Sequence, residues 1–432
     1  MALQRLNPAD HFTLVLDHEI RKSGLAGNYC ALVLELDGAP DHAEITRHCR
    51  HFSKRFPLAV ARLSRQGRQY AWETSGDDSL PFQVIKLDRD DTVCREQCLL
   101  TIINQSAPVS ASAPFELHLI ESTDHSLLVL RWFHPASDAK GAELILYHLF
   151  NDPQTTLQLQ PSPVDRLLQQ WGWWQKFRLG RRAVLNIREL DRYASVLPAA
   201  TPEVADRLAL KRVRYDRTQT AQILANARKH AGITGTTLYL IGCMMRAMET
   251  AGATQVGDAY CVPYAVNLRM RKALSPMFGN QVSFLFAQAG RVTVRSRQRL
   301  FTHLCEQNMA AIRQGMDHAM LPLMLAGSWL SLEKYGRVVR HSPSGRERSS
   351  FWFSYTGEIV PEPETIAGCP VRGMYQISQV SSPPGLGLLV SLFQGRLVLS
   401  YNYINNLVQG DWLERLAQVM TAELLDLDEK FL

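Results

Sequence analysis

The sequence predicts an α+β protein made of two halves of similar size, and three observations support this. The chain has 432 residues, well above the usual domain size of about 150 residues. With 46% hydrophobic and 20% charged residues the composition is globular, which excludes a fibrous or largely disordered protein. Strand-like and helix-like segments alternate in both halves, and no repeat of about 20 to 50 residues indicates a solenoid or propeller.

The first half combines strands with flanking helices. The expected elements are a strand, a helix, the two strands of a hairpin and a second helix, at residues 31–36, 41–56, 115–120, 126–133 and 141–150. Asp41 is placed to cap the first helix. The hairpin is indicated by two apolar runs that flank the polar turn at residues 121–125.

The second half has the same style with different residues. Helices are expected at residues 218–231, 236–251 and 409–425, and strands at 259–266, 281–286, 350–355, 386–393 and 396–403. Thr236 and Thr237 could cap the second of these helices. The last two strands form a hairpin over Gln394 and Gly395.

A break in the pattern divides the chain. Residues 151–164 are polar and contain two prolines in the sequence PSPV, which indicates a linker or a domain edge. We therefore expect an N-terminal unit at residues 1–164, a linking helical segment at 165–205 and a C-terminal unit at 206–432.

Charge and cysteine content limit the cellular setting. The net charge of +6 is mildly basic for this length, which suits an anionic partner but does not argue for nucleic acid. The eight cysteines lack the spacing of a disulfide scaffold and are expected to be reduced. The N-terminus shows no secretory signal, and the apolar run at residues 238–248 is too short to span a membrane. We expect a cytoplasmic protein, or one associated with a membrane surface.

The segment Arg131–Gly141 (RWFHPASDAKG) has a His and an Asp four residues apart at the end of a predicted strand. His134 follows the strand and Asp138 precedes a helix, which it can cap. A histidine held in this way is fixed yet accessible, which suits a general base with a pKa near neutrality. The same spacing is common by chance, so the segment alone leaves a surface-loop histidine as an alternative.

This segment resembles the His-x-x-x-Asp-Gly motif of the chloramphenicol-acetyltransferase-like acyltransferases. The superfamily includes plant alcohol acyltransferases, wax ester synthases, polyketide-associated acyltransferases and nonribosomal peptide condensation domains; in the last three the motif is usually His-His-x-x-x-Asp-Gly. His134 and Asp138 match it, whereas Phe133 replaces the first His and Ala139 replaces the Gly. Ala139 adds a methyl group beside the presumed channel. The Asp-Phe-Gly-Trp-Gly motif of the plant branch is missing from the sequence, which argues against that branch.

A second segment, Val262–Phe286 (VPYAVNLRMRKALSPMFGNQVSFLF), strengthens the resemblance. It is similar to the part of wax synthases and condensation domains in which a strand ends in an Arg motif, followed by Gly-Asn and another strand. The resemblance implies that Arg269 pairs with Asp138 and fixes the loop that holds His134. It also implies that Asn280 lies near the catalytic channel. The residues alone also allow a solvated Arg and an Asn that turns the chain.

Weaker similarities add further candidates. Residues 5–17 (RLNPADHFTLVLD) are similar to the opening strand of the wax synthase branch. Ser354 and Tyr355 lie where relatives have a strand and turn beside the channel, with a structural strand end as the alternative. Ser137 is another channel candidate, and its spacing fits no nucleophile elbow, so no acyl-enzyme is expected.

The resemblance implies a fold of two chloramphenicol-acetyltransferase-like halves, a pseudo-dimer with its active site in the cleft between them. The implied reaction moves an acyl group from a thioester to a hydroxyl or amine, with His134 as general base. The donor would be acyl-coenzyme A (acyl-CoA) or the phosphopantetheine thioester of an acyl carrier protein, used as a co-substrate with no permanently bound cofactor. The acceptor would be a small molecule. Two alternatives stay open: a free-standing condensation domain served by a carrier protein, and a binding protein of this fold that has lost turnover.

One further segment, residues 165–182 (DRLLQQWGWWQKFRLGRR), combines four aromatic residues with basic ones. Such a combination suits a membrane surface or an acidic carrier protein, and the alternative is a linker helix that packs its aromatics on the body. No metal site is expected, because no Cys and His residues have the spacing of zinc ligands.

Overall fold

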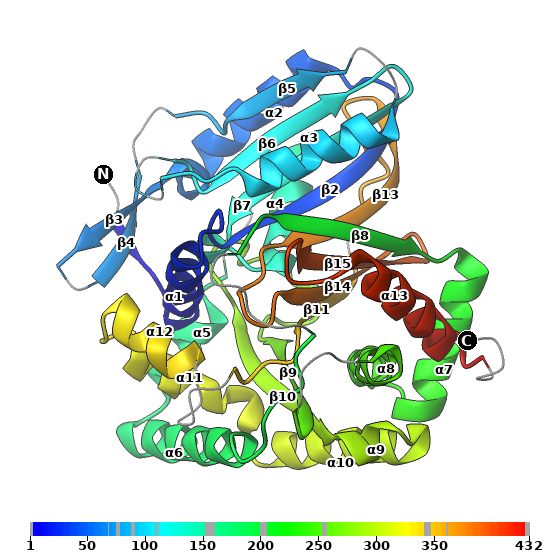
Figure 1. Ribbon diagram of the computed structural model, residues 1–432. Helices are drawn as coiled ribbons and strands as arrows, with labels where there is room; N and C mark the ends of the chain where they lie inside the picture. The colour runs from blue at the N-terminus through cyan, green and yellow to red at the C-terminus, as the bar shows by residue number, and fades with distance from the viewer. Residues whose placement is uncertain are drawn as a thin grey trace.

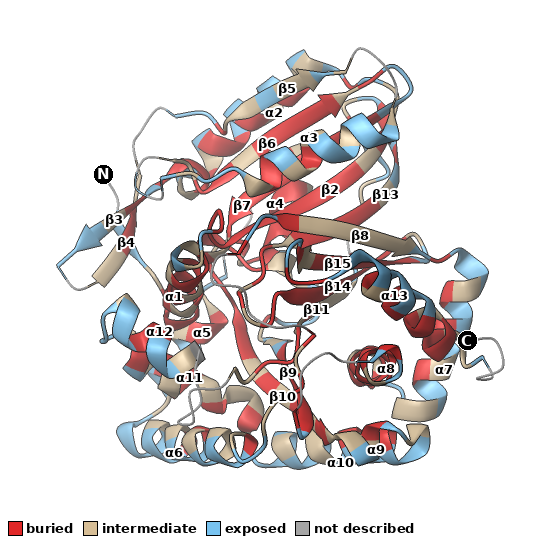
Figure 2. Ribbon diagram, viewed as in Figure 1, coloured by how far each residue is buried: buried red, intermediate tan, exposed pale blue. Residues whose placement is uncertain are grey.

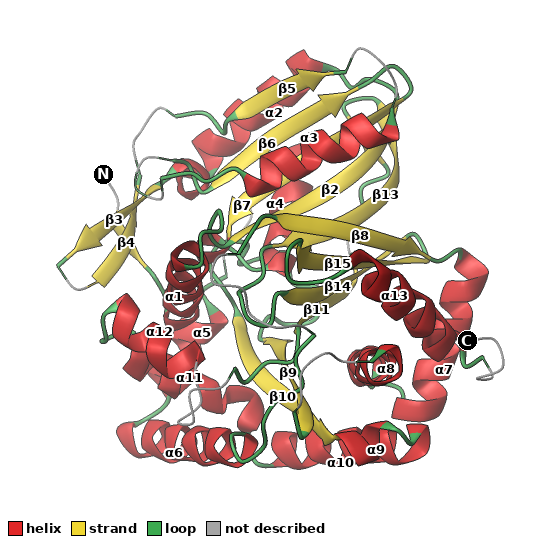
Figure 3. Ribbon diagram, in the orientation of Figure 1, coloured by secondary structure: helices red, strands yellow, loops and turns green. Residues whose placement is uncertain are grey.

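The computed structural model describes residues 3–427, except for 68, 75–77, 88–90, 109, 111, 152–159, 199–204, 253–256, 341–346 and 360–361. These residues form two α+β lobes, drawn one above the other in Figure 1 and coloured by secondary structure in Figure 3. The predicted α+β class with two lobes is confirmed.

The upper lobe is built on a six-stranded sheet within the described residues. Its strand order is β12-β13-β2-β7-β6-β5, with bounds Thr365–Ile366, Cys369–Ser378, Tyr29–Asp37, His125–Phe133, Phe115–Glu121 and Phe82–Lys86. The helices α2 (His42–Arg55) and α4 (Ala139–Phe150) cover one face, and α3 (Thr92–Asn104) covers the other.

Strand β2 is buried on both faces. Successive side chains of a strand point to opposite faces of the sheet, and each face is covered by a core. Leu32 and Leu34 pack in the core beneath α2 and α4, whereas Ala31 and Val33 pack in the core that α3 shares with the lower lobe. Figure 2 shows β2, β6 and β7 of this sheet as mostly buried, and the edge strand β5 as intermediate to exposed.

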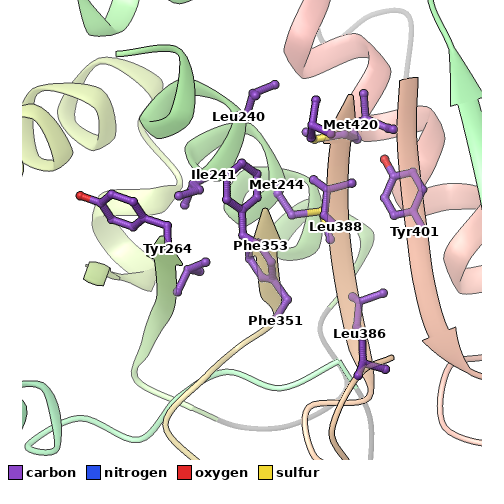
Figure 4. Close-up of a cluster of buried hydrophobic side chains, with 14 of the residues drawn as sticks. Leu240, Ile241, Met244, Tyr264, Phe351, Phe353, Leu386, Leu388, Tyr401 and Met420 are labelled. Carbon is purple, nitrogen blue, oxygen red and sulfur yellow. The ribbon is translucent and has the colours of Figure 1, made fainter. Parts of the chain in front are cut away.

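The lower lobe contains a four-stranded sheet and a separate β-ribbon. The sheet has the order β11-β14-β15-β8, with bounds Trp352–Glu358, Leu386–Phe393, Arg396–Ile404 and Leu208–Arg214; the ribbon pairs β9 (Ala259–Asn267) with β10 (Val282–Gly290). Helix α8 (Thr236–Ala251) packs against this sheet, and its Leu240, Ile241 and Met244 contribute to the core drawn in Figure 4.

Helices surround the lower lobe. They are α5, α6, α7, α9, α10, α11, α12 and α13, with bounds Pro163–Gln170, Trp173–Leu190, Arg217–Ala231, Arg291–Val294, Arg297–Arg313, Met316–Gly327, Leu332–Arg340 and Gly410–Leu425. Helix α1 (Pro8–Lys22) lies between the lobes, and β1 (Leu3–Arg5), β4 (Gln69–Glu73) and β3 (Arg62–Gln66) form a small sheet beside it.

The lobes share strands across the expected division of the chain. Strand β13 comes from the second half, yet it pairs antiparallel with β2 of the upper sheet, with Tyr375 opposite Val33. A division at residues 164 and 205 therefore describes the lobes incompletely in space.

Most expected elements of the first two thirds of the chain are present. The hairpin of β6 and β7 is confirmed, and the Asp41 side chain accepts hydrogen bonds from two backbone N–H groups of α2. The expected strand at residues 5–17 is wrong, because most of this segment is α1, which Asn7 and Asp10 start with a reciprocal capping box. The expected threonine cap of α8 is also wrong, since Gly235 occupies the cap position without a side-chain hydrogen bond.

Among the described residues, helices long and apolar enough to cross a bilayer are absent. The same part of the chain has no group of three or more His, Cys, Asp or Glu residues arranged to hold a metal ion.

Candidate active site

A cavity of about 290 Å³ lies where the two lobes meet. Its walls come from α1, the segment after β7, the β9–β10 ribbon, β11 and the end of β13. His134, Asp138 and Arg269 line it together with Ser354 and Tyr355. Residues that are more than a hundred positions apart in the sequence thus face one cavity.

His134 begins the short 3₁₀ turn that follows β7, and its backbone is held from three directions. Its N–H donates to Asn28 O at 2.9 Å, and its carbonyl accepts from Asn280 Nδ2 at 2.9 Å and from Ser137 N at 3.2 Å. The turn cannot shift without breaking contacts to both lobes, so the backbone that carries the imidazole is held at the cavity wall.

The surroundings of His134 favour a neutral imidazole. Burial lowers its pKa from the ordinary value of 6.5, and this effect outweighs its own backbone carbonyl and the Asp138 charge, which raise it. Nδ1 is buried without a hydrogen bond to another described residue. The ring at neutral pH is therefore unprotonated and can accept a proton.

Asp138 holds the loop through both carboxylate oxygens. As the N-cap of α4, its Oδ1 accepts from Gly141 N at 2.8 Å. Its Oδ2 accepts from Gln281 N at 2.7 Å and from Arg269 Nη1 at 2.8 Å. These three contacts connect the loop after His134 to α4, Arg269 and the segment at Gln281.

Arg269 makes the contact with Asp138 that the resemblance implied. The ion pair is buried, with 1% of the Arg side chain and 7% of the Asp side chain exposed. Arg269 Nε also donates to Pro276 O at 2.8 Å, and Asn267 Oδ1 accepts from Arg269 N and Nη1. Three contacts of different kinds thus fix the guanidinium plane.

Asn280 connects α1 to the loop that carries His134. Its Nδ2 donates to His134 O and to Asp10 Oδ1 at 3.0 Å, and its backbone N–H donates to the same Asp10 oxygen at 2.5 Å. The side chain is fully buried, which makes Asn280 a positioning residue beside the channel. Burial raises the pKa of Asp10 to about 7, although its hydrogen bonds with Asn280 and Asn7 lower it.

Ser137 is not among the residues that line this cavity. Its side chain is fully buried, and its Oγ lies 2.7 Å from Met277 O, to which it donates. Ser137 was expected to line the channel, but it does not line this cavity. Its hydroxyl instead connects the loop that carries His134 to Met277, in the segment before Asn280.

The two departures from the motif lie in different surroundings. Phe133 is buried in the core of the upper lobe, with its ring 5.3 Å from Tyr29, centroid to centroid. Ala139 lines the cavity. The close approach of chains occurs at Gly141 instead, where a Cβ atom would overlap with Ser137 Oγ and the carbonyl of Met277.

Sequence reasoning missed a polar group on the cavity wall. Lys140, Thr356 and Gln376 line the cavity, and each donates to the buried Glu143, at 2.6, 2.8 and 3.0 Å. Burial raises the pKa of Glu143, while the Lys140 charge opposes this. The i,i+3 pair of Lys and Glu is visible in the sequence, but nothing there links it to Gln376.

The architecture is the two-lobed α+β fold of chloramphenicol-acetyltransferase-like acyltransferases and condensation domains. It resembles the first condensation domain of the calcium-dependent antibiotic synthetase in complex with a substrate analogue, at 15% sequence identity and a TM-score of 0.74, over 99% of this chain and 96% of that chain.

Two further solved structures are similar. Trichothecene 15-O-acetyltransferase from Fusarium sporotrichioides has 11% identity and a TM-score of 0.72, over 98% of this chain and 95% of that one. The starter condensation domain of rhizomide synthetase in complex with C8-CoA has 11% identity and a TM-score of 0.69 over the same shares. No family sequence model matches the chain, and no curated protein matches it in sequence. At these sequence identities, the structural similarity shows the fold alone and not the activity.

Proposed function

We propose that this protein is an acyltransferase that moves an acyl group from a thioester to a hydroxyl or amine. The observation that carries the proposal is the fixed, neutral His134 on a cavity between two lobes, with Asp138 and Arg269 paired behind it. A positioned base of this kind accelerates proton transfer by about 10² to 10⁴-fold.

The proposed chemistry needs only His134 as an acid–base group. Its Nε2 accepts the proton of the acceptor O–H or N–H while the acceptor lone pair attacks the thioester carbonyl carbon. The tetrahedral intermediate then collapses, the C–S bond breaks and the same nitrogen returns the proton to the leaving thiolate. Bonds and protons balance without an oxidant, a metal or an acyl-enzyme.

The proposed donor is acyl-CoA or the phosphopantetheine thioester of an acyl carrier protein, and the acceptor is a small molecule. The similar fold of a condensation domain solved with C8-CoA supports a thioester of this type. A free-standing condensation domain that takes its acyl group from a carrier protein is the second candidate, supported by the similarity to other condensation domains. The third is a binding protein without turnover.

The test measures thiol release with acyl-CoA donors of increasing chain length and a mixture of alcohols and amines. We expect release that requires both substrates, and a loss of at least about 10²-fold in His134→Ala. His42→Ala, on α2 and away from the cavity, is the matched control and should keep its activity. Activity only with acylated carrier proteins would favour the condensation domain, and inactivity with both donors would favour a binding protein. Equal activity in His134→Ala and wild type would refute the mechanism.

A further inference from the structure

A second cavity, larger and more apolar than the first, lies beside it. Its volume is about 630 Å³, and it lies among α1, α6, α11, α12 and the β9–β10 ribbon. The side chains that line both cavities are Phe12, Leu16, Pro263, Phe284, Trp352 and Ser381. The two cavities therefore adjoin, and the second begins where the pocket of His134 ends.

The lining of this second cavity is suited to an aliphatic chain. Val15, Val184, Ile187, Leu323 and Met324 form much of its apolar wall. Six charged residues also contribute to the wall: Glu19, Arg188, Asp191, Arg337, Glu347 and Arg348. Asp191 and Arg348 pair with each other through two contacts of 2.7 and 3.0 Å. The wall is otherwise mostly apolar, which suits a hydrocarbon chain.

We infer that the second cavity binds the long hydrocarbon chain of a substrate whose reacting end lies at His134. This rests on the proposed function for the reacting end, and on the volume and lining for the chain. A methylene group needs about the space of one water molecule, about 30 Å³. The volume of about 630 Å³ therefore has room for about 20 methylene groups, which is enough for a long acyl or alkyl chain. The chain belongs either to the acyl donor or to the acceptor.

The test measures binding by calorimetry and does not depend on turnover. One series uses acyl-CoA from C2 to C18, and a second uses primary alcohols of the same lengths. Burial in the cavity predicts affinity that rises about fourfold per methylene, equivalent to ~0.8 kcal/mol, up to a plateau. A negative heat-capacity change should accompany the rise. A rise in the first series assigns the chain to the donor, and a rise in the second assigns it to the acceptor.

Two adjacent residues of α6 provide a matched pair of variants. Val184→Trp fills the cavity and should shorten the longest chain that still gains affinity, whereas Leu185→Trp, on the exposed side of the same helix, should leave the plateau unchanged. Affinity independent of chain length in both series would overturn the inference, whether or not the protein turns over. Chain-dependent binding without any thiol release would leave the inference standing and would refute the proposed acyl transfer.

A separate observation concerns the outer face of α6. Trp173, Trp174 and Phe177 are 66%, 73% and 54% exposed, and their rings touch one another, with Trp173 stacked on Phe177 at 5.7 Å between centroids. Helix α6 carries five basic residues and one acidic residue. Figure 1 shows it at the lower edge of the molecule. Clustered exposed aromatics beside basic residues are typical of a helix that lies in a membrane interface.

We propose that this face of α6 binds the surface of an anionic lipid bilayer. The charge complements anionic headgroups, and the three rings can enter the interface together. The same helix contributes Val184 and Ile187 to the larger cavity, so the aromatic cluster and the cavity share one element.

Co-sedimentation with vesicles tests this surface. We expect binding to vesicles containing phosphatidylglycerol, weakening with salt, and weak binding to pure phosphatidylcholine. Arg178→Gln should weaken binding about fivefold, equivalent to ~1 kcal/mol. Trp173→Ser with Trp174→Ser should abolish it, whereas Met309→Ser with Ile312→Ser, exposed on α10, should not. Equal binding by both double variants, or α6-dependent binding to an acidic carrier protein without vesicle binding, would overturn the proposal.

Discussion

Replacing Asp138 by Asn tests whether the buried ion pair with Arg269 positions His134. The carboxylate accepts three hydrogen bonds, from Gly141 N, Gln281 N and Arg269 Nη1, at 2.7 to 2.8 Å. In Asp138→Asn the amide oxygen can keep the bond to Gly141, but the amide NH₂ then faces two donors. Both of their bonds are lost, and a buried guanidinium stays without its counter-ion.

The expected cost follows from the burial of the pair. Breaking a buried ion pair by removing one partner costs about 3 to 5 kcal/mol. The structure places this pair at the upper end of that range, because 1% and 7% of the two side chains are exposed. The loop would also be free to move His134, and a displacement of about 1 Å can lower activity about 10²-fold.

The control is a buried carboxylate away from the cavity. Glu423 pairs with Arg246 at 2.7 Å, with 5% and 9% of their side chains exposed, and also with Arg297 at 2.6 Å, and none of the three lines the cavity of His134. Glu423→Gln should lose at least as much free energy of unfolding, measured with urea, and keep its thiol-release activity per folded molecule. If Asp138→Asn is too unstable to purify, Arg269→Lys keeps the charge but loses the fixed fork geometry, and should show the same separation at smaller size.

Two outcomes would refute this reasoning. In the first, Asp138→Asn keeps its stability within about 1 kcal/mol of wild type, which would mean that the buried pair does not carry the expected energy. In the second, Glu423→Gln loses as much activity per folded molecule as Asp138→Asn. The activity loss would then reflect general destabilisation rather than the position of His134.

Three further predictions concern pH and close packing. Because burial lowers the His134 pKa, kcat/KM should stay flat from pH 8 down to 6.5 and fall only below that; an acid limb with its midpoint above 6.5 would contradict the assigned protonation state. The folded-state pKa of Asp10, about 7, lies above its ordinary value of 3.8, so its contribution to stability is complete below pH 3.8 and is lost as pH rises through 7. The free energy of unfolding of wild type, measured with urea, should fall by up to ~1.4 kcal/mol per pH unit over this range. Asp10→Asn should lack this contribution to the pH dependence. If the free energies of unfolding of the two proteins change with pH in parallel, Asp10 does not titrate between pH 3.8 and 7 in the folded state. Gly141→Ala should cost about 1 to 3 kcal/mol and reduce activity because its Cβ overlaps with neighbouring atoms, and Ala139→Gly should cost less than about 1 kcal/mol and keep activity. If thermal unfolding shows the same loss of stability in both variants, the close packing at Gly141 does not restrict its side chain as we expect.

The elements that sequence reasoning predicted are those with regular local patterns. The β6–β7 hairpin and the β14–β15 hairpin are apolar runs around short polar turns, so the local sequence was enough. Helix α11 was missed because Pro322 lies inside it, where proline ordinarily breaks a helix. Strand β13 was missed because Pro370 and Gly373 interrupt its pattern, and because its partner β2 is more than 300 residues away.

The candidate site was predictable where a motif carried it. The pairing of Asp138 with Arg269 was implied by the resemblance of two segments to the acyltransferase family, whereas the residues alone left a solvated arginine open. The role of Asp10 was not foreseen, because a capping box looks the same on any surface helix, and only the fold brings it to Asn280. Ser137 was misplaced for the same reason: its hydroxyl is turned toward Met277 by contacts that the sequence does not show.

The departures from the acyltransferase motif do not weaken the case for an enzyme, because neither removes a group that faces the reaction. Phe133 packs against Tyr29 in the core of the upper lobe, while His134, the first residue after β7, lines the cavity. The tight approach that a glycine would serve has its place at Gly141, two residues after Ala139. A binding protein would need the cavity but would have no use for a neutral imidazole held by contacts from both lobes. Under the proposed function, these contacts would hold the base where a donor and an acceptor meet, as acyl transfer requires.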